Sequence, residues 1–228
     1  KSPRQFTPGR LEVSVRSLQD ALQRGGWRDA EVTVARVERD DTSGAVNVDI
    51  SVHEGQRRFL RFVEVEVYEL DATKPVATRL LEPREPYSQR FLQDLQQHLR
   101  VEQFRRGYPD AQVELLPLRE EQVGYAWFVD LQARVQTGRP VRVSEIRFDG
   151  QKKTQDSVMR RQVKLDPGDK LDRIEAERGS QRLSRLGIFR TVELRLEPPE
   201  AEERALLYHV EEGRQLDVNL LLGYGSYE

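Results

Sequence analysis

Residues 26–32 read GWRDAEV, residues 107–113 read GYPDAQV, and residues 187–192 read GIFRTV. Each stretch opens with a glycine, continues with a large apolar or aromatic residue, and runs on into further apolar positions. The three glycines recur with a period of about 80 residues. Self-similarity at a fixed period is typical of tandem modules. The chain of 228 residues is therefore predicted to hold three copies of one structural unit.

A helical pattern precedes each of these glycines. Apolar residues spaced by three or four positions lie on one face of a helix. A glycine just past the last turn can take the left-handed conformation that ends helices. We therefore expect a helix directly before each glycine, with its apolar face on a core. The facing residues are Leu11, Val15, Leu18 and Leu22 in the first unit, Phe91, Leu95 and Leu99 in the second, and Ala176, Ser180, Leu183 and Leu186 in the third, where Gly179 would allow close backbone approach.

Two alternating runs follow each glycine and end at a second glycine, namely Gly55, Gly138 or Gly213. The positions three, five and seven residues before this second glycine are apolar in every unit. Alternation with a period of two predicts a half-buried strand. These positions are Val52, Ile50 and Val48, then Val135, Ala133 and Leu131, then Val210, Tyr208 and Leu206.

The second and third units also begin with an alternating strand, at residues 59–68 and 141–148. The predicted fold class is α+β: a tandem array of three βααββ modules, each a three-stranded mixed sheet with two helices on one face. Few residues precede the helix of the first module, which is therefore expected to be N-terminally incomplete. In the second module, prolines interrupt residues 73–86, where the first helix belongs.

The third unit carries a family likeness. Residues 143–150 (VSEIRFDG) and 182–192 (RLSRLGIFRTV) resemble the barrel-proximal polypeptide-transport-associated (POTRA) domain of BamA-type and TamA-type bacterial outer-membrane protein assembly factors. Residues 223–226 (GYGS) are similar to the first barrel strand of that family. The resemblance is good over residues 139–228 and extends to the rest of the chain as a pattern.

This resemblance implies domain limits, a location and partners. It implies modules at residues 1–56, 57–139 and 140–215, followed at 216–228 by the start of the first barrel strand. The chain would be the periplasmic portion of an outer-membrane protein that binds and guides clients. The implied partners are unfolded outer-membrane proteins, accessory periplasmic or lipoprotein subunits, and the membrane through a C-terminal barrel. Two alternatives stay open: the POTRA region of a two-partner secretion pore, and a soluble periplasmic scaffold for partner proteins.

The family topology also implies where clients bind. It puts the strand after each recurring glycine at a sheet edge, and such an edge can accept an extended client by β-augmentation. The short connections between modules would set module orientation and allow limited hinge motion. The predicted edge residues are Ala111, Val113 and Leu115, with Thr191, Val192, Leu194 and Leu196, and the predicted junction residues are Gly55, Arg57, Gly138 and Pro140.

The composition argues against other classes of protein. The formal net charge is −2, whereas a nucleic-acid binder needs a basic face against phosphates. The chain has no cysteine, and its three histidines stand far apart, so we expect no metal site and no cofactor. Because no set of acid–base or nucleophilic residues is found, the chain is predicted not to be an enzyme. The histidines are His53, His98 and His209, and the aromatic residues Trp27, Tyr108 and Phe189 are expected to pack in cores rather than stack on a ligand.

Overall fold

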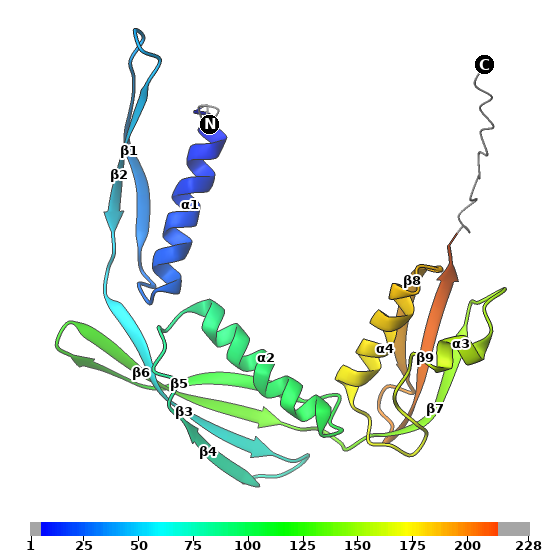
Figure 1. Cartoon of the computed structure of the whole chain (residues 1–228). Coiled ribbons are helices and arrows are strands. Elements are labelled where there is room, and N and C mark those ends of the chain that lie inside the picture. Colours follow the sequence, from blue (N-terminus) through cyan, green and yellow to red (C-terminus); the bar gives the residue numbers. More distant parts are fainter. Residues whose placement is uncertain (1–5, 214–228) are drawn as a thin grey trace, which may run out of the picture. The chain divides into compact units, whose positions relative to one another are not determined.

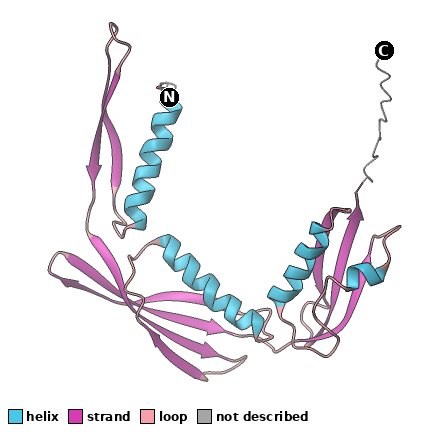
Figure 2. Cartoon of the chain, viewed as in Figure 1, coloured by secondary structure: helices cyan, strands magenta, loops and turns pink. Residues whose placement is uncertain are grey.

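The computed structural model describes residues 6–213 and divides the chain into two compact units. The first unit comprises residues up to 102 together with 111–138, and the second comprises 103–110 together with 139 onward. Three separate sheets, each accompanied by helices, confirm the predicted α+β class and its tandem organisation (Figures 1 and 2). The predicted start of a barrel strand at 216–228 lies outside the described residues. The module limits at 56, 139 and 215 stay a prediction.

The first module consists of one helix and one hairpin. Helix α1 (Pro8–Arg24) begins after Thr7, whose side-chain oxygen accepts a hydrogen bond from the backbone N–H of Arg10 at 3.3 Å. Strands β1 (Glu31–Arg39) and β2 (Val46–His53) pair antiparallel. No residue of α1 is buried, and Val32 alone is buried in β1. The apolar faces of both elements are therefore only partly covered.

The second module has a four-stranded sheet in the order β4-β3-β6-β5. The central strands β3 (Arg57–Tyr68) and β6 (Ala126–Gln136) run parallel, and each pairs antiparallel with its outer neighbour. The outer strands are β4 (Ala77–Leu81) and β5 (Gln112–Val123), and helix α2 (Gln89–Arg105) covers one face. The core under this helix includes Leu60, Val63, Val65, Leu99, Val113, Val129, Leu131, Ala133 and Val135.

The second module departs from the predicted pattern of three strands and two helices. Residues 77–81, within the segment where the first helix was expected, form strand β4 instead. The cause lies in the sequence, because Pro75, Pro83 and Pro86 remove backbone donors and disfavour the helical conformation of the residues before them. An edge strand tolerates such boundaries, and β4 pairs with β3 from Val63 to Val67.

The third module follows the full predicted order. Its sheet runs β7-β9-β8, with β7 (Arg142–Asp149) parallel and β8 (Phe189–Glu197) antiparallel to β9 (Glu203–Glu212). Helices α3 (Asp156–Arg160) and α4 (Arg173–Arg185) supply the second layer. The predicted strand positions Leu206, Tyr208 and Val210 are fully buried, as are Ala176 and Leu183 of the predicted helix face.

Gly179 of α4 allows the close approach that its place in the helix predicts. The hydroxyl of Tyr208 donates a hydrogen bond to the carbonyl oxygen of Ala176 at 2.9 Å. A Cβ at position 179 would lie 2.7 Å from that hydroxyl oxygen. A side chain on Gly179 would thus push Tyr208 out of its position in the core.

Candidate functional site

Both predicted client-binding strands lie at a sheet edge. β5 has β6 as its strand neighbour and β8 has β9, so the outer main-chain groups of each have no strand partner among residues 6–213 (Figure 1). Val113 and Leu115 lie in β5 and Ala111 directly precedes it, whereas the four predicted residues of the third module all lie in β8.

Two observations indicate which main-chain groups of β5 face away from β6. The side-chain amide of Gln96, on α2, donates a hydrogen bond from Nε2 to the carbonyl oxygen of Val113 at 2.5 Å, reaching it from outside the ladder. Pro117 has no N–H, and sheets tolerate proline where its nitrogen faces away from the neighbouring strand. Along an antiparallel strand, the main-chain groups of every second residue point to the same side. Val113, Leu115 and Pro117 are two positions apart, so their main-chain groups all point to the same side of β5. The outward groups of β5 are therefore those of Val113, Leu115 and Pro117.

The regular part of this edge ends at Pro117. Leu118 is skipped in the register between β5 and β6, and Arg61 is skipped in the register between β3 and β6. Both irregularities lie beside Asp130 of β6. Arg61 binds this carboxylate through Nε at 2.9 Å and Nη2 at 2.7 Å, which lowers the pKa of Asp130. This bidentate ion pair thus holds the sheet together at the point where the registers of β3 and β5 with β6 are irregular.

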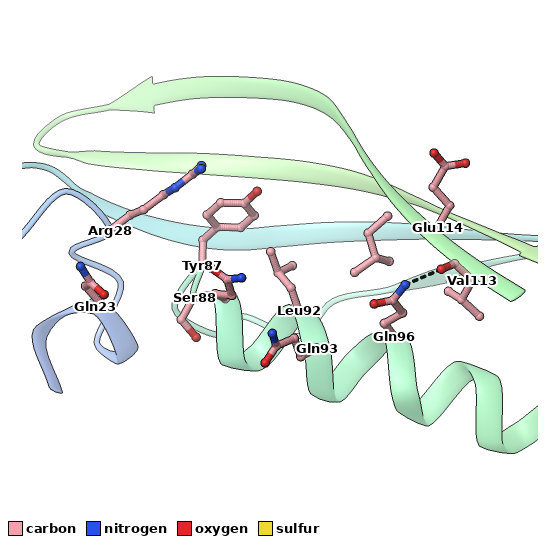
Figure 3. A pocket seen from close by; sticks show the side chains of 11 residues that line it. Gln23, Arg28, Tyr87, Ser88, Leu92, Gln93, Gln96, Val113 and Glu114 are labelled. Carbon is pink, nitrogen blue, oxygen red and sulfur yellow. Dashed lines mark hydrogen bonds between the residues drawn. The ribbon is translucent and has the colours of Figure 1, made fainter. Parts of the chain in front are cut away.

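A groove of about 660 Å³ lies between α2 and β5. Leu92 and Leu115 are among its apolar lining residues. Tyr87 and Arg28 lie at one end, with the guanidinium carbon of Arg28 6.0 Å from the centre of the Tyr87 ring (Figure 3). Gln96 and the start of β5 lie at the other end. A lining that mixes apolar side chains with glutamine amides suits the alternating side chains of an extended peptide.

The β8 edge does not border this groove. Val192, Leu194 and Leu196 are half-buried and pack against the core of their own module. Thr191 donates a hydrogen bond from its hydroxyl to Glu211 on the neighbouring strand at 3.3 Å. These side chains of β8 contact their own module, so a partner would bind to the main chain of β8.

The recurring glycine also forms a joint with the chain that follows its module. Gly26 has a φ of +98°, and its carbonyl oxygen accepts a hydrogen bond from the backbone N–H of Arg58 at 2.8 Å. Gly107 has a φ of +94°, and its carbonyl accepts the N–H of Val141 at 2.8 Å. The helix-ending role predicted for these glycines is therefore only part of what they do.

The predicted junction residue Arg57 completes the first of these joints. Its Nε donates to the carbonyl oxygen of Gly25 at 3.0 Å, and its guanidinium lies 4.4 Å from the Trp27 ring and 4.6 Å from the Phe59 ring. Trp27 is therefore half-buried against an arginine instead of lying in a core, which corrects the expectation for this residue. Phe189 does lie in a core, and Tyr108 is half-buried. The other predicted junction residues are Gly55 at a φ of +68°, Gly138 at a φ of +73°, and Pro140, which is exposed.

Residues 6–213 contain no group of three metal-ligating side chains. His53 and His98 are exposed, and Nδ1 of His209 lies 2.6 Å from a carboxylate oxygen of Asp149. Among the same residues, no helix is long and apolar enough to cross a bilayer.

Comparison with known proteins decides the family. The profile of the POTRA family, described as a surface antigen variable number repeat, matches residues 1–55 and 141–213, which together are more than half of the chain. The chain belongs to the POTRA family. The predicted resemblance to BamA-type factors agrees with the relatives that match this chain.

The similar proteins include relatives from two genera. The outer membrane protein assembly factor BamA of Neisseria meningitidis serogroup B is 23% identical over 191 residues, covering 83% of this chain and 24% of that protein. The chain therefore spans about a quarter of the length of this relative. The crystal structure of POTRA domains 3–5 of Haemophilus influenzae BamA has a TM-score of 0.54 at 24% identity, covering 92% of this chain and 83% of that one. BamA of Haemophilus ducreyi lacking POTRA domains 1–3 has a TM-score of 0.52 at 24% identity, covering 58% and 25%. The two structures share the fold of this chain.

Proposed function

We propose that these POTRA modules bind extended segments of unfolded outer-membrane proteins by β-augmentation, chiefly at β5. The observation that carries the proposal is an edge strand that borders a groove of about 660 Å³. Main-chain hydrogen bonds supply affinity with little sequence preference, and pockets for alternate side chains add a modest preference for apolar residues. A factor that handles many different clients needs this combination.

The relationship to BamA favours outer-membrane proteins as the clients over the cargo of a secretion pore or the partners of a free scaffold. Accessory periplasmic or lipoprotein subunits stay predicted partners. They would suit β8, whose backbone forms an edge away from the groove. The two edges would then serve different partners.

The test uses a nitroxide-labelled peptide of about ten residues that alternates apolar and polar side chains, a length typical of one strand. Nuclear magnetic resonance of the whole chain would follow which backbone amides the nitroxide broadens. We expect broadening along Gln112–Leu116, the part of β5 before Pro117. Broadening confined to other elements, or none at saturating peptide, would show that β5 is not the binding edge.

A pair of variants tests the main-chain contribution. Leu115→Pro removes one outward donor, and Leu115→Ala also shortens the side chain but keeps that donor. We expect peptide binding to Leu115→Pro to be about fivefold weaker than binding to Leu115→Ala, the size of one hydrogen bond. Circular dichroism would confirm that both variants fold. Equal affinities would mean that side chains alone hold the peptide.

A further inference from the structure

Gln96 occupies a main-chain acceptor that an incoming strand would need. The residue lies on α2, is half-buried, and points across the groove to β5, where its Nε2 bonds the carbonyl oxygen of Val113 at 2.5 Å (Figure 3). Strand pairing is built from regular N–H to C=O bonds along the edge. A client strand that pairs with the start of β5 therefore competes with the Gln96 amide for this oxygen.

The outward face of the regular stretch of β5, before the irregularity at Leu118, is restricted at both ends. Val113 offers an N–H beside its occupied carbonyl, and Pro117 offers a carbonyl but no N–H. Leu115, between them, presents both of its main-chain groups, and no partner for them is found in the described part of the chain. In the free protein, Leu115 is thus the residue of this regular stretch that is fully open to pairing.

We propose that Gln96 is a gate on the β5 edge, which rests on the proposed function of that edge in binding clients. In the free protein it caps Val113, so short or poorly matched strands find too few partners to pair stably. A client strand long enough to use the whole edge displaces the amide, which turns into the groove. Exposed edges invite unwanted pairing with other chains, and a removable cap reduces this liability while keeping the edge usable.

The gate predicts that removing the amide strengthens binding. Gln96→Leu keeps a similar side-chain size and abolishes the donor, so Val113 is open to the peptide from the start. We expect the nitroxide peptide to bind this variant about threefold to tenfold more tightly than the wild-type chain, the range given by one hydrogen bond. Gln96→Glu, whose carboxylate at neutral pH also donates no hydrogen bond, provides a second variant should the leucine disturb folding.

Gln93→Leu is the matched control. Gln93 lines the same groove one turn earlier on α2 and is exposed. The substitution adds the same apolar surface without touching the Val113 carbonyl. We expect its affinity for the peptide to change less than that of Gln96→Leu, because the bond between Gln96 and Val113 stays in place. An equal gain for Gln93→Leu and Gln96→Leu would assign the effect to a more apolar groove and overturn the gate.

The signals of the Gln96 side-chain amide give a direct second measurement. On addition of peptide to the wild-type chain, they should shift and exchange faster with water, because the bond to Val113 is lost. If the peptide broadens β5 amides but Gln96 is unmoved and Gln96→Leu binds no better, the gate is wrong and the client-binding edge stands. If the nitroxide reaches β5 in neither the wild-type chain nor the variant, the proposed function fails at this edge, and the gate with it.

Discussion

The first and third modules carry the same strand pattern and bury it to different extents. Val210 in β9 is fully buried, whereas Val52, at the same repeat position in β2, is 43% exposed. Tyr208 and Ile50 differ in the same way, at 0% and 40%. The third module has a third strand and two helices to close its core, and the described residues of the first have one helix and one hairpin. An alternating pattern thus sets which face a strand turns inward, and the other layers decide how deeply that face is buried.

The first module compensates at its joint with the second. Beside the bond between Gly26 and Arg58, the guanidinium of Arg58 pairs with Asp29 at 2.6 Å and that of Arg57 lies on Trp27. These contacts lie where α1 ends and β3 begins. We infer that the stability of the first module depends on this joint more than on its own core.

The largest expected effect comes from breaking that joint. A Cβ on Gly26 would lie 2.6 Å from the carbonyl oxygen of Arg58, in addition to the strain of a left-handed conformation. Gly26→Ala should therefore destabilise the first module by about 3 kcal/mol, the sum of backbone strain and a lost main-chain hydrogen bond. Hydrogen exchange of amides in β1 and β2 would measure it.

Gly187→Ala is the matched control for this substitution. Gly187 also has a positive φ, of +71°, but no described atom lies within 4 Å of the place its Cβ would take. The strain alone should cost about 1 kcal/mol. If the two alanine variants lost the same stability, the carbonyl of Arg58 would not explain the need for glycine at position 26.

The next effect compares the two cores directly. Val210→Ala removes two buried carbons and leaves a cavity, which should cost about 2 kcal/mol in the third module. Val52→Ala removes the same atoms from a side chain that is 43% exposed and should cost less than about 1 kcal/mol. Chemical denaturation followed by hydrogen exchange in β9 and β2 would separate the two modules. A larger loss for Val52→Ala would mean that the first module has a core comparable to that of the third.

The sequence predicted the elements that local pattern controls. The helix before each glycine, the phase of each last strand and the close approach at Gly179 depend on spacing and on residue type, which a single chain shows directly. Strand β4 was within reach of the same reasoning, because prolines at 75, 83 and 86 already argue against a helix there. The sequence alone does not show what residues 77–81 would pair with. In the structure they pair with the edge of β3.

The details of the candidate site could not be predicted in this way. Gln96 and Val113 are brought together by the packing of α2 on the sheet, and nothing in their sequence spacing marks the contact. Trp27 looked like a core residue because Tyr108 and Phe189 have a similar place just after the end of a helix. Its actual partner, Arg57, comes from the next module, and a comparison within repeats does not include contacts between them.

The smallest expected effect is a dependence of stability on pH that belongs to the third module. The carboxylate of Glu212, at the end of β9, accepts hydrogen bonds from the backbone N–H groups of Lys153 at 3.0 Å and Thr154 at 2.8 Å, and these bonds lower its pKa from 4.5 to about 2. Because the folded state holds the charged form, the contribution is fully present above pH 4.5 and is lost as the pH falls toward 2. Glu212→Gln should therefore reduce the melting temperature of the third module at neutral pH, and the difference from the wild-type chain should shrink as the pH falls from 4.5 toward 2.

The first module provides the control. The loop that supplies the two N–H groups joins β7 to α3, and these elements have no counterpart among the described residues of the first module. Hydrogen exchange in β1 and β2 should therefore be the same in both proteins at every pH. If the difference in melting temperature between Glu212→Gln and the wild-type chain stayed the same from neutral pH to pH 2, Glu212 would not hold this loop in place.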